Sequence, residues 1–288
     1  MPSLKAIRNR IVSVKNTEKI TRAMKLVAAA RLRRAQEAIT AQRPYAQRIE
    51  EIIAEIATRA GESAHPLLAQ REPRETQVLV LSSDRGLAGG FNSNINRRTD
   101  RFLADMSEQH NRVAGLQVVG RKGRDYHRRR NREIVREYVG VSSDTALERA
   151  KEIAVRVMGD FQSEKLDAVY MIYNEFKNAV SQQVVAVKLL PIDPKTLATG
   201  GSNDFIYEPS KEELLTHLLP LHVEMQIYRA LLESVASEFG ARMTAMENAT
   251  RNAKEMIDKL QLVYNRSRQA AITKELLEII GGAEALKG

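Results

Sequence analysis

A narrow row of apolar or small residues, spaced three or four positions apart, is the most regular pattern near each end of the chain. In residues 3–60, which contain no glycine and a single proline, this spacing predicts a helix. The other helix faces are basic and polar, so the pattern is typical of a coiled-coil edge. Pro44 is expected to kink or break the helix, because it removes a backbone donor. The row comprises Leu4, Ile7, Ile11, Val14, Ile20, Met24, Val27, Leu32, Ala35 and Ile39.

The C-terminal part repeats this pattern. Residues 221–280 contain no proline and one glycine, and the mean step of the row is close to the 3.5 residues of a supercoiled pair. A helix of this length would extend roughly 90 Å. Because neither helix can bury its row alone, we expect the two to pack on each other in antiparallel orientation. The second row comprises Phe239, Met243, Met246, Ala249, Ala253, Met256, Leu260, Val263, Ser267 and Ala270.

Short apolar runs alternate with amphipathic segments in the middle of the chain. This alternation predicts an α/β layer with a largely parallel sheet. The predicted strands are 77–82, 116–119, 133–139, 168–173 and 183–190, with a further candidate at 205–207. The predicted helices are 92–109, 121–131, 145–161 and a short one at 211–219. The expected fold is therefore a long antiparallel coiled coil of the N- and C-terminal helices (1–60 and 210–288) plus a central Rossmann-like α/β domain (61–209).

Charge and composition limit the kinds of functional site that this chain can form. The net charge is +9, and residues 1–48 alone carry twelve Lys/Arg against two acids, which makes the first helix a basic rod. The chain has no cysteine, which excludes disulfides, thiol catalysis and thiolate metal sites. Its five histidines do not pair at helical spacing, so no metal site is expected. No apolar run approaches the ~20 residues of a membrane span.

Two polar segments of the middle part each allow two interpretations. Residues 82–90 follow a predicted strand and precede a helix, where a phosphate-binding loop would lie. They match neither common glycine-rich phosphate motif, so a tight strand-to-helix turn is favoured over a nucleotide site. Residues 121–136 carry eight Lys/Arg against two acids, which is compatible with nucleic-acid binding. A solvated helix face, or a surface toward an acidic partner, is favoured.

The two terminal segments resemble a known family. Residues 16–36, NTEKITRAMKLVAAARLRRAQ, are similar to the N-terminal helix of the gamma subunits of F-type ATP synthases. Residues 261–285 resemble the C-terminal signature of that family, with Ile272, Thr273, Glu275 and Glu278 at its core. The resemblance extends through residues 83–92 and 207–209 to essentially the whole chain, although 120–165 agrees only in general layout.

This resemblance implies a mechanical function. Members of the family form the central shaft of a rotary motor, with the coiled coil in the axis of a hexamer of alpha and beta subunits. The α/β domain and an epsilon subunit sit on a membrane ring of c subunits. The resemblance therefore implies a peripheral subunit at the cytoplasmic face of the bacterial plasma membrane, with no catalytic, cofactor or metal site of its own and no nucleic-acid partner. The cysteine-bearing redox segment of chloroplast members should be absent.

The resemblance also assigns contact residues. It implies that Met24 and Arg242 lie near an acidic lever loop of beta. It places Arg266, Gln269 and Thr273 near a polar catch loop of the hexamer. Tyr207 and Glu208 would belong to the foot that rests on the c ring.

Two other classes of function remain as alternatives. A coiled-coil nucleic-acid binder would show salt-sensitive binding of DNA or RNA by the isolated chain. A small-molecule enzyme on the Rossmann-like domain would need a bound nucleotide and a catalytic constellation, and the sequence presents no triad, metal-ligand cluster or carboxylate pair.

Overall fold

A computed structural model of the chain describes residues 3–60, 65–109, 111–179, 181–194, 197 and 211–285. The chain divides into two compact units. The coiled-coil unit comprises residues 1–27 and 243–288, and the α/β unit comprises residues 28–242. Two long helices, α1 (Leu4–Ala60) and α5 (Lys211–Ala285), contribute to both units. The predicted fold class, long terminal helices with a central α/β domain, is confirmed.

One five-stranded sheet forms the centre of the α/β unit. Its strands are β1 (Glu75–Leu81), β2 (Arg112–Val119), β3 (Ile134–Tyr138), β4 (Ala168–Phe176) and β5 (Gln182–Leu190). The strand order is β3-β2-β1-β4-β5; the first four strands are parallel and β5 pairs antiparallel with β4. The chain order therefore reverses beside β1, which makes the carboxyl ends of β1 and β4 the switch point of a doubly wound sheet.

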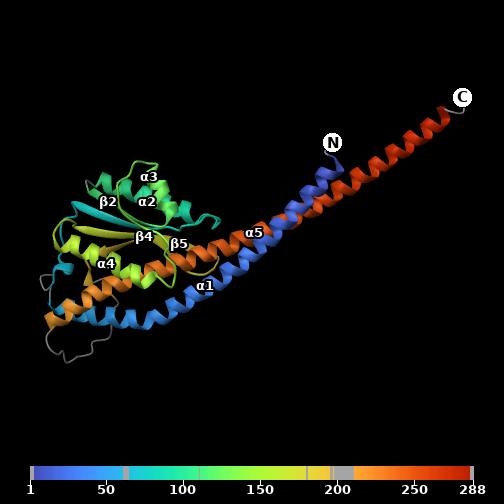
Figure 1. Cartoon of the computed structure of the whole chain (residues 1–288). Coiled ribbons are helices and arrows are strands. Elements are labelled where there is room, and N and C mark those ends of the chain that lie inside the picture. Colours follow the sequence, from blue (N-terminus) through green and yellow to red (C-terminus); the bar gives the residue numbers. More distant parts are fainter. Residues whose placement is uncertain are drawn as a thin grey trace. The chain divides into compact units, whose positions relative to one another are not determined.

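Helices cover both faces of this sheet (Figure 1). Helices α2 (Phe91–Glu108) and α3 (Arg121–Arg128) lie on one face, and α4 (Ala146–Gln162) and α5 lie on the other. The central strand β1 is apolar on both faces for this reason. Val78 and Val80 pack beneath α2, whereas Leu79 and Leu81 pack with α4 and α5. A short 3-10 turn, η2 (Pro66–Leu68), contributes Leu67 and Leu68 to the core that contains Leu79 and Leu81.

The prolines of the two long helices do not end them. Of the two outcomes expected at Pro44, a kink or a break, the break does not occur, because α1 continues through it. Pro44 and Thr40 are both exposed, so water can bond to the Thr40 carbonyl that loses its helical partner. Pro220 likewise lies inside α5, which joins the predicted short helix 211–219 to the long one. The candidate strand at 205–207 lies outside the described residues.

Candidate partner-binding surface

In the coiled-coil unit, α1 and α5 run antiparallel along a regular seam. Thr21 faces Thr250 with 2.8 Å between their hydroxyl oxygens, and the Lys25 Nζ lies 2.7 Å from Glu247 Oε1. Steps of three and four residues alternate along both sides of the seam, as in a supercoiled pair. Its buried and half-buried members include Leu4, Ile7, Ile11, Val14, Glu18, Thr21 and Lys25 on α1, and Met246, Thr250, Ala253, Ile257, Leu260, Tyr264, Ser267 and Ala271 on α5.

Part of the seam differs from the sequence prediction. Five apolar residues expected in the seam are exposed instead: Ala270 and the larger Ile20 (59%), Val27 (55%), Met256 (44%) and Val263 (48%). The expectation assigned seam positions by hydrophobicity, but a pair of facing threonines can satisfy each other's hydroxyls and occupy the seam. The strict 3.5-residue step then turns the neighbouring apolar side chains outward. That step, rather than hydrophobicity, was the signal in the sequence that could have identified Thr21 and Thr250.

Met24 lies on the flank of this seam. Its side chain is half-buried, between the buried Thr21 and the ion-paired Lys25. The adjacent outer surface of α1 carries the exposed apolar residues Ile20 and Val27, four residues before and three residues after Met24. Met24 is therefore placed where it can contact a second polypeptide without leaving the two-helix packing.

The predicted C-terminal contact residues share one exposed face of α5. Arg266, Gln269 and Thr273 are all exposed, and their spacing of three and four residues puts them on one side of the helix. Arg offers a planar fork of donors, and Gln offers a donor and an acceptor. The structure thus brings these three predicted residues together, and their side chains are available to a polar partner.

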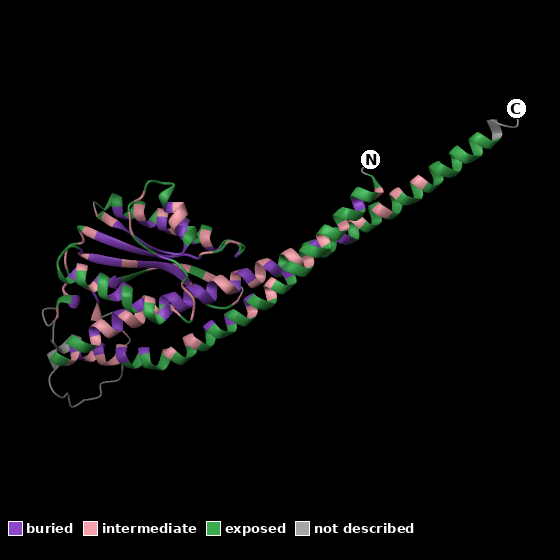
Figure 2. Ribbon diagram, in the orientation of Figure 1, coloured by how far each residue is buried: buried purple, intermediate pink, exposed green. Residues whose placement is uncertain are grey.

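The last turns of α5 expose apolar side chains. From residue 272 to 283 every described side chain is exposed, as Figure 2 shows for the C-terminal end of α5. One ion pair on this stretch, Lys274 to Glu278 at 3.6 Å, lies on its surface. The exposed large apolar residues are Ile272, Leu276, Leu277, Ile279 and Ile280. A row of this kind is suited to binding a partner, because covering solvated apolar side chains lowers the free energy.

An open groove runs between the two helices near the start of α1. The sequence did not predict it, because it depends on how the helices pair. Its walls combine one cation and one anion with apolar and amide side chains: Arg8, Ile11, Asp258, Gln261, Leu262, Tyr264 and Asn265.

Arg242 belongs to the α/β unit and is surrounded by its own chain. Its residue is 7% exposed, and its guanidinium donates hydrogen bonds to Glu238 and to the backbone carbonyl of Gly86. A contact between Arg242 and a partner subunit stays a prediction.

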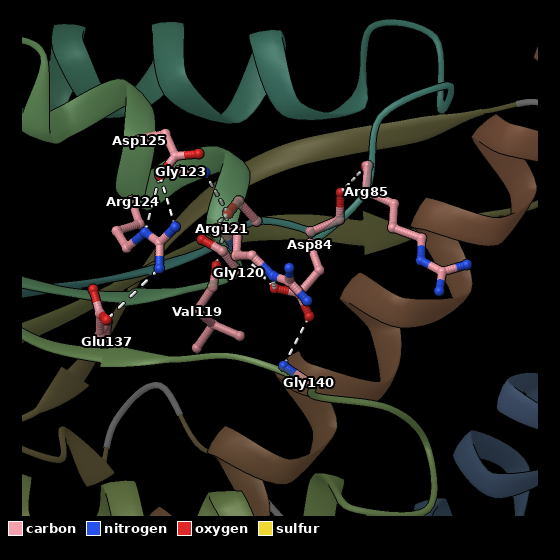
Figure 3. Close-up of polar contacts among 12 residues, drawn as sticks. Asp84, Arg85, Val119, Gly120, Arg121, Gly123, Arg124, Asp125, Glu137 and Gly140 are labelled. Carbon is pink, nitrogen blue, oxygen red and sulfur yellow. Dashed lines mark hydrogen bonds and ion pairs between the residues drawn. The ribbon is translucent and has the colours of Figure 1, made fainter.

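The loop after β1 is tied to α3 by its own side chains (Figure 3). The Asp84 carboxylate accepts hydrogen bonds from the backbone N–H groups of Arg121 (3.0 Å) and Gly140 (2.8 Å). The Ser83 carbonyl accepts from the N–H of Lys122 at 3.0 Å. Free N–H groups at a helix start are what a bound phosphate would use. At α3 these donors point at the chain's own oxygens.

Close backbone approach explains the two glycines at the β2–α3 turn, which packs against the loop after β1. The Gly123 N–H donates to Ser82 Oγ at 2.9 Å, and a Cβ on Gly123 would come within 2.6 Å of that oxygen. Gly120 has φ +90°, and a Cβ there would lie 2.6 Å from the Ser82 carbonyl oxygen. The segment 82–90 is a tight strand-to-helix junction, which is the favoured interpretation of its sequence.

Much of the basic segment after β2 is paired within the α/β unit. Glu137 forms ion pairs with Arg124 and Arg128. Asp100 on α2 accepts from the Tyr126 hydroxyl and pairs with Arg132, both at 2.5 Å. Burial opposes ionisation of Asp100, but these two hydrogen bonds and the positive charges of Arg132 and Arg130 together outweigh it and lower the pKa of the carboxyl.

Among the described residues no group of three or more His, Cys, Asp or Glu side chains is arranged to hold a metal ion. No described helix has an apolar stretch long enough to cross a membrane. Tyr207 and Glu208, the predicted foot residues, lie outside the described residues.

Comparisons with known proteins agree with one another. The family model for ATP synthase matches residues 3–286. A chain from Anaeromyxobacter sp. (strain Fw109-5), named ATP synthase gamma chain, is 57% identical over 291 residues and covers 100% of both chains. A gamma chain from Geobacter sp. (strain M21) is 48% identical over 294 residues, again with 100% of both chains covered.

Solved structures extend this similarity. The chain is similar to one in the central stalk and c-ring structure of Tetrahymena thermophila mitochondrial ATP synthase, with 29% identity, a TM-score of 0.61 and coverage of 80% of this chain and 99% of that chain. A chain in an F1 and c-ring assembly of the Euglena gracilis mitochondrial enzyme shares the fold, with a TM-score of 0.69, 20% identity and coverage of 98% and 94%. From the full-length match and these relatives it follows that the chain belongs to the ATP synthase gamma-chain family.

Proposed function

We propose that this chain is the central rotor shaft of an F-type ATP synthase. It couples ion-driven rotation of the membrane c ring to conformational cycling of the catalytic beta subunits during ATP synthesis or hydrolysis. The chemistry belongs to the beta subunits, and this chain requires no cofactor or metal. Its partners are the alpha and beta subunits of the hexamer, the epsilon subunit and the c ring.

The observation that carries the proposal is the coiled-coil unit. Two helices share one seam. Beside its end α5 exposes Arg266 and Gln269, and beyond it α5 exposes Thr273 and the apolar residues of its last turns. A shaft in a sleeve needs such a surface, since apolar contacts lack the directional bonds that would resist sliding. The unit also carries fourteen Lys/Arg against seven Asp/Glu, which suits an acidic environment.

The contacts follow the predicted assignments. Met24 faces an acidic lever loop on beta, and Arg266, Gln269 and Thr273 engage a polar catch loop on the hexamer. The grip must be modest, because a contact that is too strong would trap one rotary state. A rotating shaft changes each beta subunit by binding its alternative conformations with different free energies.

The remaining assignments concern the membrane end. In this proposal residues 1–60 and 210–288 form the shaft, and residues 61–209 form the central domain. Tyr207 and Glu208 belong to the foot on the c ring. The complex holds the chain as a peripheral subunit at the cytoplasmic face of the bacterial plasma membrane.

Geometry also weighs against the alternatives. A nucleotide enzyme would use the polar atoms of the loop after β1, where Ser82, Ser83 and Asp84 already accept hydrogen bonds from the N–H groups of α3. A nucleic-acid binder would use the basic segment after β2, where Glu137 and Asp100 neutralise several of the arginines.

The experiment is co-expression with alpha and beta subunits, each in tagged and untagged form. We expect a stable complex in which all three chains copurify and ATP hydrolysis depends on this chain. Isothermal titration of ATP into the isolated chain is the companion measurement. A failure to copurify, or stoichiometric micromolar ATP binding by the isolated chain, would contradict the shaft function.

A further inference from the structure

We infer that a buried clamp around Arg242 fixes the rotational setting of α5 on the α/β unit, which makes Arg242 a positioning residue for the transfer of torque. The clamp comprises Arg31, Gly86, Glu238, Phe239 and Arg242, all of them in the α/β unit. The inference rests on the proposed shaft function and assigns Arg242 a role inside the chain.

The hydrogen bonds of Arg242 join α5 to the loop after β1. Its Nη2 lies 2.6 Å from Glu238 Oε1, one turn earlier on α5, and 3.2 Å from the Gly86 carbonyl oxygen. The side chains of this ion pair are only 9% and 15% exposed. Charge-assisted hydrogen bonds of a buried guanidinium are stronger and more directional than those between neutral groups. Glu238 thus orients the guanidinium that binds the loop.

An aromatic ring brings the first helix into the same clamp. The Arg242 guanidinium carbon lies 5.3 Å from the centre of the Phe239 ring. The guanidinium of Arg31 on α1 lies 5.5 Å from the same centre. Both distances are within the range of cation–π attraction. Helix α1, the loop after β1 and helix α5 therefore meet around the Phe239 ring and the Arg242 guanidinium.

The loop bound by Arg242 is held firmly on its other side. Asp84 fixes it to the start of α3 and to the backbone of Gly140 (Figure 3). Leu87 has φ +64°, a conformation that residues with a side chain rarely adopt, and its side chain is 65% exposed. Such a conformation persists only where the surroundings determine it. A rigid loop makes the Gly86 carbonyl a fixed point against which α5 can be held.

Two serine hydroxyls attach the preceding turns of α5 to the sheet. Ser237 Oγ donates to the Asn174 carbonyl of β4 at 3.0 Å, and Ser234 Oγ donates to the Leu81 carbonyl of β1 at 3.4 Å. A Cβ on Gly240 would lie 3.2 Å from the Ala179 carbonyl oxygen, so α5 also approaches the β4–β5 connection closely. Contacts with both strands at the switch point thus lead up to the Arg242 clamp.

The N-terminal part of α5 packs on the sheet in a different way. Leu219, Val223 and Ile227 are fully buried in the apolar core beneath the sheet. Apolar packing holds a helix in place but sets its rotation about its own axis less strictly than directional bonds do. Hydrogen bonds from α5 to the strands begin at Ser234, and Arg242 adds the charge-assisted one to the loop after β1. These bonds resist rotation of α5 against the sheet.

The test measures torsional stiffness in the reconstituted complex with alpha and beta subunits. A single cysteine replaces the exposed Ser107 of α2 in this cysteine-free chain and carries an optical probe, while the hexamer is fixed to a surface. Arg242→Met keeps the stem but removes the donors. Arg229→Met is the matched control, because Arg229 forms the same i,i+4 pair with Glu233 on α5.

We expect the angular variance of the probe during a catalytic pause to rise by about twofold in Arg242→Met, since the loop attachment is lost. The control should keep the wild-type variance, and Arg242→Lys should recover part of the stiffness. If Arg242→Met does not assemble, Phe239→Leu removes the shared ring and is expected to raise the variance as well. Wild-type variance in the assembled Arg242 or Phe239 variant would overturn the clamp. A wild-type probe that never rotates would instead overturn the shaft function.

Discussion

The coiled-coil unit and the α/β unit bury their apolar residues in different ways. Each helix of the coiled coil has one partner, so only Ile7, Met246, Ala253 and Ile257 are buried apolar side chains among its described residues. The sheet of the α/β unit is covered on both faces, and its cores contain many fully buried residues. Burial of this extent gives the α/β unit its own stability, whereas the coiled-coil unit leaves most of its surface for other subunits.

The two units also differ in net charge. The coiled-coil unit has a net charge of +7, from fourteen Lys/Arg and seven Asp/Glu, whereas the α/β unit has thirty-one against twenty-nine. Like charges on a thin two-helix unit repel one another. A partner with acidic side chains would relieve this repulsion, so assembly should stabilise the coiled-coil unit more than the α/β unit.

The largest expected effect compares truncation in the two units. Phe161 is fully buried in the core between sheet and helices, whereas Ile257 is a 7% exposed member of the two-helix seam. We expect Phe161→Ala to lower the free energy of unfolding by about 3–5 kcal/mol. Ile257→Ala should cost about 2 kcal/mol, because the thin seam can collapse and water reaches it. Urea unfolding followed by circular dichroism measures both. Equal costs would contradict the comparison.

A mildly acidic pH should act on the α/β unit alone. All five histidines belong to it, and burial lowers the pKa of His127 and of His222 to about 4. Between pH 7 and pH 5 the unfolded chain binds a proton at each of these residues, while the folded chain does not. The free energy of unfolding therefore decreases as the pH is lowered from 7 to 5, by about 2 kcal/mol for each histidine.

Thermal denaturation at pH 7 and pH 5 tests this expectation. His222→Leu, which keeps an apolar side chain at the site, should remove about half of the pH dependence, since two buried histidines share it. The melting temperature of the coiled-coil unit, followed by a probe on α5, should stay constant. An equal shift of both units would show that groups other than these histidines control the acid response.

Much of the fold is predictable from local patterns. The five strands lie at the predicted apolar runs. The clearest is β1, because a central strand covered on both faces must be apolar throughout. Prolines mislead this reasoning, since Pro44 stands on a solvated side of α1 where a lost hydrogen bond is cheap. The seam of the coiled coil was only partly predictable, because Thr21 becomes a seam residue through its partner Thr250, 229 positions away.

The threonine pair permits a smaller test of the seam. Thr21 and Thr250 share a hydrogen bond of 2.8 Å. The double change to Val should leave the melting temperature unchanged or raise it, because both polar groups leave together. A single change should cost about 1 kcal/mol. A double-mutant cycle should give a coupling energy of about 0.5–1 kcal/mol. Additive single effects would show that the hydroxyls do not interact.

Substitutions on the exposed face near the end of α5 should have the smallest effect on stability. Their effect should be seen in ATPase turnover instead. Arg266→Ala combined with Gln269→Leu should change the stability of the isolated chain by no more than ~0.5 kcal/mol. In the reconstituted complex the same change should lower multisite ATPase turnover, since the catch contact is lost. Lys259→Ala, another exposed α5 position, serves as the control. Normal turnover in a fully assembled variant would remove Arg266 and Gln269 from the contact surface.

Rotation is the most direct measurement of the central claim. The complex of this chain with alpha and beta subunits is attached through the hexamer, with a probe on a cysteine at position 107 of the α/β unit. On addition of MgATP the shaft function predicts continuous rotation of the probe in one direction, at a rate that follows ATP hydrolysis. A complex that hydrolyses ATP while the probe stays at one angle would contradict it.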